Sequence, residues 1–164
     1  MSESGRISQI RAVVSGPSEL WLAVRMLFWA ALLPFLKRIM PLPRLVSVMT
    51  PAHRRVPDER RSAVVVTLAR WAYKTGALRD NCLERSLITY RYLPAGNEDS
   101  RLVLGVRRGD DGPPGHAWLT VRGEAVHDTE ATLQNLVPIV AFDLDGRRCP
   151  VPEPVTPVPP VAPA

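Results

Sequence analysis

Apolar residues surround almost the whole circumference of the first strongly patterned segment, residues 18–33. The run Pro17-Ser18-Glu19 suits a helix start, and Pro34 is expected to kink or end the helix. A helix that is apolar all round needs cover on more than one side. Its aromatic residues are therefore expected either to pack in the core or to contact a partner protein. These residues are Trp21, Phe28 and Trp29.

Charged residues and a proline interrupt the apolar stretch that follows Leu20. Its longest uncharged run, from Met26 to Leu36, is 11 residues long, whereas a membrane-spanning helix needs roughly 20. The first residues, Met1 to Gly5, hold no basic segment that leads into an apolar core, as a signal peptide requires. We therefore expect neither a membrane-spanning segment nor a signal peptide.

A second helix is expected from Pro57 to Gly76. Asp58 and Glu59 suit its N-terminus, and a glycine commonly follows the last residue of a helix. The inner face of this helix would be formed by Val65, Leu68, Ala69 and Ala72.

A third helix is expected to begin at Asn81-Cys82. The Asn81 side chain can accept hydrogen bonds from the first free amides, and Glu84, three residues on, completes the pattern of a capping box. Glu84 would point away from the apolar face. That face would be formed by Leu83, Leu87 and Tyr90. Cys82 would lie in the first turn, where the positive end of the helix dipole lowers the pKa of a thiol and favours the nucleophilic thiolate.

The hydrophobic pattern changes from a helical to an alternating period after residue 100, which is typical of strands. The alternating apolar residues are Leu102, Leu104 and Val106. Further strands are expected over 116–120 and 125–128, while 129–148 would hold one more strand, with or without a short helix. This order of elements indicates an α+β fold in which the helix that carries Cys82 packs on a small antiparallel sheet.

The register of the predicted hairpin decides which residue faces His116. A three-residue loop, Val121 to Gly123, places glycine at the position that favours a left-handed backbone. His116 would then lie opposite Asp128, with their Cβ atoms about 5 Å apart. A two-residue loop would shift the pairing by one residue and bring His127 or Thr129 nearer instead. The position of the glycine favours the three-residue loop.

The length of the chain suits one domain with an adequate core. Along the sequence we predict a loose N-terminus (1–16), an N-terminal helical region (17–56), a core (57–148) and a disordered tail (149–164). The tail consists mostly of Pro, Val and Ala, a composition that favours an extended and disordered chain.

Charge and cysteine content argue against several classes of protein. The chain carries 21 Lys+Arg against 16 Asp+Glu, and this excess forms no long block, so nucleic-acid binding is not expected. The two cysteines, Cys82 and Cys149, give no disulfide framework, which favours a reducing cytoplasm. The sequence has no phosphate-binding glycine loop and no CxxC pair, so we expect no cofactor and no metal ion.

Cys82, His116 and Asp128 together have the chemistry of a cysteine hydrolase. Such an enzyme needs a thiolate, an imidazole that takes and returns a proton, and a third group that fixes the imidazole tautomer. Asp128 would accept a hydrogen bond from Nδ1 of His116, and the backbone amide of Cys82 could donate to an oxyanion. From the residues alone, two other interpretations stay open: Cys82 can be an inert buried thiol, and His116 can be a structural strand residue.

Four parts of the chain, in this order, resemble a known family. They are residues 82–87 (CLERSL), 102–107 (LVLGVR), 115–119 (GHAWL) and Asp128. Together they resemble the leader peptidases of lasso-peptide biosynthesis, which belong to the transglutaminase-like cysteine protease superfamily. The resemblance covers roughly residues 57–130. It implies a transglutaminase-like or papain-like core in which Cys82, His116 and Asp128 form the catalytic triad.

The resemblance also implies a function and its partners. Such a peptidase removes the leader from a ribosomally made precursor peptide, and a separate ATP-dependent lasso cyclase then joins the new N-terminal amine to a side-chain carboxylate. Because no leader-reading domain is expected ahead of the helices, the chain resembles the separate protease half of these systems, and a small leader-recognition protein is the expected partner.

Two alternatives to a leader peptidase remain from the sequence. One is a transglutaminase or amidase that acts on Gln or Asn side chains with the same triad. The other is a peptide-binding module of the same fold that does not cut its ligand.

Overall fold

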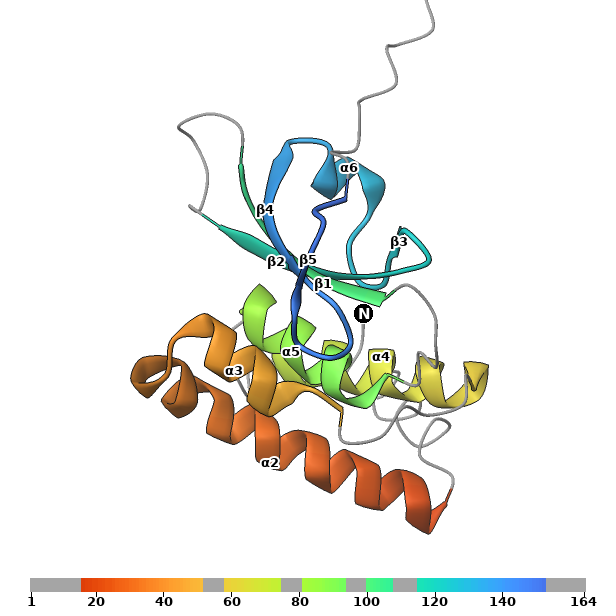
Figure 1. Cartoon of the computed structure of the whole chain (residues 1–164). Helices are drawn as coiled ribbons and strands as arrows, with labels where there is room; N and C mark the ends of the chain where they lie inside the picture. Colours follow the sequence, from red (N-terminus) through yellow and green to blue (C-terminus); the bar gives the residue numbers. More distant parts are fainter. Residues whose placement is uncertain (1–15, 52–57, 75–80, 94–99, 108–114, 153–164) are drawn as a thin grey trace, which may run out of the picture.

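The computed structural model describes residues 16–51, 58–74, 81–93, 100–107 and 115–152 of the 164-residue chain. The helices are α2 (Pro17–Ile39), α3 (Leu42–Met49), α4 (Glu59–Lys74), α5 (Cys82–Tyr92) and α6 (Glu130–Leu133). The strands are β1 (Ser100–Arg107), β2 (His116–Val121), β3 (Glu124–Ala125), β4 (Leu136–Phe142) and β5 (Arg148–Cys149). Figure 1 shows α2 to α5 gathered on one side of the sheet, so the predicted α+β class is confirmed.

The strands form one antiparallel sheet in the order β3-β2-β1-β4-β5. The predicted strands over 102–106 and 116–120 correspond to β1 and β2, which pair from Ser100 opposite Val121 to Gly105 opposite His116. This pairing places the start of β2 beside β1, the central strand of the sheet, and α5 packs against β2. The position of His116 relative to α5 is therefore set by the sheet.

The first helix does not end at Pro34, because α2 continues to Ile39. A proline inside a helix loses one backbone hydrogen bond, but contacts on both sides of Pro34 hold this helix in place. Leu33 is fully buried before it, and Lys37 forms an ion pair with Glu84 of α5 beyond it, at 2.5 Å. These contacts with the core offset the missing hydrogen bond.

Helix α5 lies between the other helices and the sheet, and residues 84–90 are all buried. The expectation that Glu84 points away from the core is wrong: only 3% of this residue is exposed. The reason is that α2 covers this side of α5, and the ammonium group of Lys37 neutralises the Glu84 carboxylate. Glu84 therefore joins two helices.

The inner face predicted for the second helix is confirmed, since Val65, Leu68, Ala69 and Ala72 are all buried in α4. Asp58 precedes this helix and accepts a hydrogen bond from the backbone amide of Arg61 at 3.1 Å, as expected of a residue at a helix start. The predicted boundary residues, Pro57 and Gly76, lie outside the described residues.

The predicted register of the β2–β3 hairpin is wrong by one residue. Val121 lies opposite Glu124 and Thr120 opposite Ala125, so the loop is the two residues Arg122 and Gly123. Both have a left-handed backbone, with φ of 53° and 83°, as a two-residue type I′ turn requires. The prediction gave this conformation to the glycine alone. After Ala125 the chain leaves the ladder and bends over residues 126–128.

A single hydrophobic cluster joins α2, α3, α4 and α5 to the near face of the sheet. A smaller cluster on the far face contains Trp118 of β2 and Leu133 of α6. The N-terminal helices thus share the core with the rest of the protein. The predicted boundary at residues 56 and 57 lies outside the described residues, as does most of the predicted tail, whereas Cys149 is the last residue of β5.

Gly105 leaves no room for a side chain, and this can be tested. A Cβ at this position would lie 2.5 Å from the carbonyl oxygen of Val137 and 2.9 Å from the Trp118 ring. We expect Gly105→Ala to lower the free energy of unfolding by about 1–3 kcal/mol, measured by urea denaturation. Gly115→Ala is the matched control, because the nearest atom to its Cβ would be 3.7 Å away. Equal losses in both variants would contradict the close packing of Gly105.

Candidate active site

Cys82 is the first residue of α5, as predicted. The side chain of Asn81 caps this helix by accepting hydrogen bonds from the backbone amides of Leu83 and Glu84, at 3.1 and 3.3 Å. The first amides of a helix have no acceptor within the helix and carry its positive partial charge. The Cys82 thiol and its own backbone amide therefore lie in an electropositive first turn.

His116 and Asp128 are hydrogen-bonded to each other, with Nε2 of His116 donating to Oδ1 of Asp128 at 3.0 Å. The nitrogen differs from the one predicted, which was Nδ1. His116 also forms a side-chain hydrogen bond with Cys82, and because Nε2 is engaged by Asp128, Nδ1 is left for the thiol. The structure thus brings the three predicted site residues together in one connected chain.

Asp128 contacts His116 from a bend in the chain, whereas the predicted register placed the two residues opposite each other in the sheet. In the observed register the ladder between β2 and β3 ends at Ala125, so Asp128 does not lie opposite His116 in the sheet. Instead, the bend over 126–128 turns the Asp128 side chain back toward the start of β2. Only 7% of this side chain is exposed.

The three groups shift one another's pKa in opposite directions. Burial of Cys82 would raise the pKa of its thiol, but hydrogen bonds from His116 and from the backbone amide of Ala117 outweigh it, so this pKa lies below its ordinary value of 9.0. The hydrogen bond to Asp128, followed by that to Cys82, raises the pKa of His116 from 6.5 to about 9. A thiolate–imidazolium pair is therefore favoured at pH values between the pKa of the Cys82 thiol and the pKa of His116.

The carboxyl group of Asp128 stays ionised although it is nearly buried. Burial would raise its pKa, but the hydrogen bond from His116 and the positive charges of His116 and Arg85 bring the pKa below 3.8. An ionised carboxylate is the form that stabilises an imidazolium.

A family model of the transglutaminase-like superfamily matches residues 20–141. The chain belongs to the transglutaminase-like superfamily. The match includes Cys82, His116 and Asp128, and it begins within α2. The superfamily is generally catalytic and includes cysteine peptidases and acyltransferases. Comparisons with curated proteins and with solved structures find no match.

Two polar residues of this transglutaminase-like site were not identified from the sequence. Ser86 donates a hydrogen bond to the carbonyl oxygen of Ala117 at 2.9 Å and so ties α5 to β2. Arg85 contacts Oδ1 of Asp128 at 3.5 Å. The available signal was their spacing, because residues three and four positions after Cys82 share its face of a helix.

The site opens into a cleft of about 600 Å³. The cleft is lined by Asn81, Cys82, Leu83, Arg85, Leu104, Gly105, Gly115, His116 and Ala117. Trp118 stacks on the His116 ring, with ring centroids 6.0 Å apart and planes at 19°, which limits the orientations that the imidazole can adopt. Within the described residues, no group of three or more His, Cys, Asp or Glu side chains is placed to hold a metal ion.

The pH dependence of Cys82 alkylation tests this electrostatic chain. In a Cys149→Ser background Cys82 is the one remaining thiol, and we expect the midpoint of its reaction with iodoacetamide to lie below pH 9, because the imidazolium stabilises the thiolate. Asp128→Asn removes the charge that stabilises the imidazolium, so the midpoint of the rate–pH curve should rise by about one unit. Asp145→Asn, in the β4–β5 turn, is the control and should leave the midpoint unchanged. An unmoved midpoint in Asp128→Asn would contradict the assignment.

Proposed function

We propose that this chain is the peptidase that removes the leader peptide from a ribosomally made precursor during lasso-peptide maturation. The observation that carries the proposal is a thiol hydrogen-bonded to an imidazole, which is itself held by a buried carboxylate at an open cleft. The motifs CLERSL at 82–87 and GHAWL at 115–119 support the leader-peptidase branch, since they resemble those enzymes.

The proposed reaction proceeds in two acyl-transfer steps. The Cys82 thiolate attacks the carbonyl carbon of the scissile peptide bond, and the backbone amide of Cys82 can donate to the oxyanion that forms. The His116 imidazolium then gives its proton to the nitrogen of the breaking bond. The core peptide leaves with a free N-terminal amine, and the leader remains bound to Cys82 as a thioester.

Hydrolysis of the thioester completes the cycle. His116, now neutral, takes a proton from a water molecule while the water oxygen attacks the thioester carbonyl. The leader leaves as a carboxylate, and the thiolate–imidazolium pair is restored. The amine released in the first step is the group that a separate ATP-dependent lasso cyclase would join to a side-chain carboxylate. We place the reaction in the cytoplasm, where Cys82 stays reduced.

The first test is removal of the nucleophile. We expect Cys82→Ala to lower the rate of precursor cleavage by about 10⁴-fold or more, because the first step has no other thiolate. Cys149→Ala is the matched control, since it makes the same change at the other half-buried cysteine, and it should cut at the wild-type rate. Near wild-type cleavage by Cys82→Ala would refute the mechanism.

The products distinguish a peptidase from the transglutaminase alternative. Hydrolysis leaves a leader fragment with a new carboxylate and a core fragment with a new amine, both visible by mass spectrometry. Acyl transfer from a Gln side chain would instead release ammonia and leave the backbone intact.

Helix α2 presents an apolar face that the described part of the chain leaves exposed. Trp21 is 64% and Phe28 63% exposed, whereas Trp29 is partly buried beneath Arg91. Other exposed apolar residues on this helix are Leu20, Val24, Leu27, Phe35 and Ile39. Contiguous exposed apolar surface of this kind marks an interaction site. Among the described helices, α2 is also the one long and apolar enough to cross a membrane, with 28% of its most apolar window buried in the protein.

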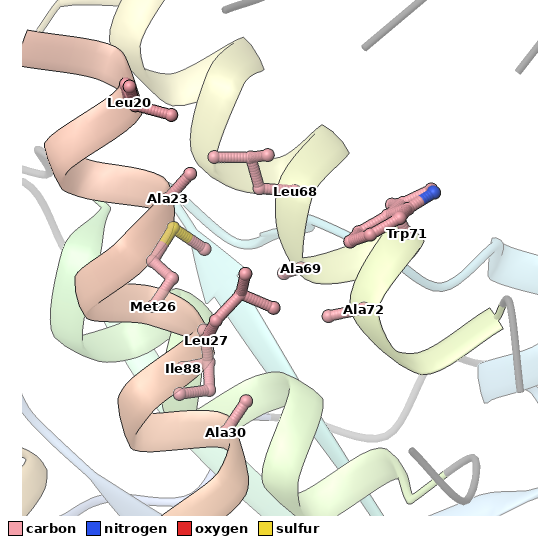
Figure 2. Close-up of a pocket in the computed structure, with 10 residues that line it drawn as sticks. All are labelled: Leu20, Ala23, Met26, Leu27, Ala30, Leu68, Ala69, Trp71, Ala72 and Ile88. Atoms are coloured by element: carbon pink, nitrogen blue, oxygen red, sulfur yellow. The ribbon is translucent and has the colours of Figure 1, made fainter. Parts of the chain in front are cut away.

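A recess beside this face favours a protein partner over a bilayer. Figure 2 shows side chains from α2 and α4 around an apolar groove, with Leu27 on one side and Leu68 and Trp71 on the other. Its volume is about 340 Å³. A groove between two helices accepts the apolar side chains of an amphipathic partner helix.

Exposed charges on α2 and α3 indicate the character of that partner. Arg25 and Arg38 are exposed on α2, as is Arg44 on α3, while the acidic Glu19 is already paired with Arg60 at 3.1 Å. A partner with an apolar centre and an acidic rim would complement this surface. We propose that the small leader-recognition protein docks here and brings the precursor to the cleft.

The recognition protein should increase cleavage only when the substrate carries the leader. Holding the precursor near Cys82 raises the local concentration of the scissile bond, so adding the recognition protein should increase cleavage by about 10²-fold. Cleavage of a fragment without the leader should not respond. Equal rates on the full precursor with and without the partner would show that the peptidase reads its own substrate.

The docking surface can be tested separately with a double variant, Trp21→Ser with Phe28→Ser. Cleavage of the full precursor by this variant should no longer increase when the recognition protein is added, but its rate without the recognition protein should be that of the wild type. Ile139→Ser is the matched control, because Ile139 is 60% exposed on β4 and lies in the sheet. If the double variant keeps the increase in cleavage with the recognition protein but loses self-association, the face binds a second copy of the chain. If it keeps the increase but loses binding to anionic vesicles, the face binds a membrane surface.

A further inference from the structure

One face of α5 carries a stripe of polar residues that points toward the site. Cys82, Arg85, Ser86 and Thr89 follow the spacing i, i+3, i+4, i+7, which places them along one side of a helix. Ser86 holds the backbone of β2 at Ala117, as described above. The same stripe contains two contacts with the bend that carries Asp128.

The first of these contacts joins Thr89 to His127, with Oγ1 and Nε2 2.6 Å apart. The Thr89 hydroxyl donates to the carbonyl oxygen of Arg85 at 2.9 Å, so it accepts the hydrogen bond from His127. The second contact joins the guanidinium of Arg85 to Oδ1 of Asp128 at 3.5 Å. The helix that carries the thiol therefore also holds the segment that carries the carboxylate.

Asp128 depends on such side-chain contacts, because no sheet pairing fixes its position. The ladder between β2 and β3 holds two residue pairs and ends at Ala125. Arg85 is 9% exposed, and its guanidinium meets the same carboxylate oxygen that accepts the hydrogen bond from His116. A buried cation 3.5 Å from one carboxylate oxygen attracts that oxygen and disfavours rotation of the carboxylate away from it.

We propose that Arg85 is the positioning residue of the site: it holds the Asp128 carboxylate on Nε2 of His116 and ties it to the helix that carries Cys82. This role rests on the proposed function, in which His116 moves the proton, but the contact itself needs no substrate. It acts through Asp128 and does not take part in the chemical steps.

The pKa of His116 distinguishes positioning from a purely electrostatic effect. The charged groups around Asp128 are Arg85 on α5, His116 on β2 and His127 in the same bend, with Cys82 beyond His116. The positive charge of Arg85 by itself disfavours a second positive charge on His116, so removing it would raise the pKa of His116. If Arg85 positions the carboxylate, removing it lets the carboxylate turn away, and the pKa of His116 falls.

The test is a titration of the histidine side chains by NMR, on protein labelled with ¹³C in the imidazole rings. The chain has three histidines, and the His116 signal is assigned by its loss in His116→Ala. We expect the pKa of His116 to be about 9 in the wild-type protein and to fall by about one unit or more in Arg85→Gln. Arg85→Lys should give a smaller fall, because it keeps the charge but loses the planar fork.

The matched control is Arg91→Gln, which makes the same change on the same helix. Arg91 donates to the carbonyl oxygen of Val48 and lies over the Trp29 ring, on the side of α5 that faces the other helices. Its loss should leave the pKa of His116 unchanged, even if it lowers the thermal midpoint. The control therefore separates a general loss of stability from displacement of Asp128.

An unchanged or raised pKa of His116 in Arg85→Gln would overturn the proposal. If that variant does not fold, Arg85→Lys decides by the same criterion. On the proposed substrate, kcat should fall with KM unchanged in Arg85→Gln, and Arg85→Lys should recover part of kcat. The titration uses no substrate, so a protein that cuts no precursor can still show the predicted fall, and a working peptidase can still fail to show it.

Discussion

The burial of α5 between the helical layer and the sheet is the constraint on which the rest of the structure depends. Polar groups in such a place need partners, because an unpaired buried polar group costs about 1–3 kcal/mol. On the side facing α2, Glu84 is satisfied by Lys37. On the side facing the sheet, Ser86 donates to the carbonyl oxygen of Ala117, and one guanidinium nitrogen of Arg85 contacts the Asp128 carboxylate. The contacts that these buried polar groups form determine which residues surround the Cys82 thiol.

The site also alternates in charge, which allows it to be partly buried. A thiolate, an imidazolium, a carboxylate and a guanidinium follow one another from Cys82 to Arg85 by way of His116 and Asp128. Each negative group lies next to a positive one, so the attraction between neighbours offsets the loss of hydration. Two of the four groups come from α5, so the helix supplies both ends of this chain.

Local signals made much of the site predictable from the sequence. The cap at Asn81 and the start of α5 depend on residues within one helical turn, and the strand that begins at His116 follows from a short alternating pattern. The register of the hairpin was not predictable in this way, because it required Arg122 to adopt a left-handed backbone, which is uncommon for a residue other than glycine. Asp128 was assigned from the resemblance to the leader peptidases as well as from the pairing, and the structure places its carboxylate on His116.

Other features depend on contacts between distant parts of the chain. Glu84 is buried because α2 runs past Pro34 and places Lys37 above it. The partners of Arg85 and Ser86 lie 43 and 31 residues away, so the spacing from Cys82 places both residues on its face of the helix but does not identify what they contact. Their roles follow from the tertiary fold alone.

The dependence of Cys82 on partners from the second half of the chain has a consequence for newly made protein. While the chain is unfolded, His116 and Asp128 are far from Cys82, and its thiol has the ordinary pKa of a cysteine. The reactive thiolate appears when β2 packs on α5. Synthesis thus yields a chain whose cysteine keeps the reactivity of an ordinary thiol until the second half of the chain has folded onto α5, so that folding itself sets the reactivity of this residue.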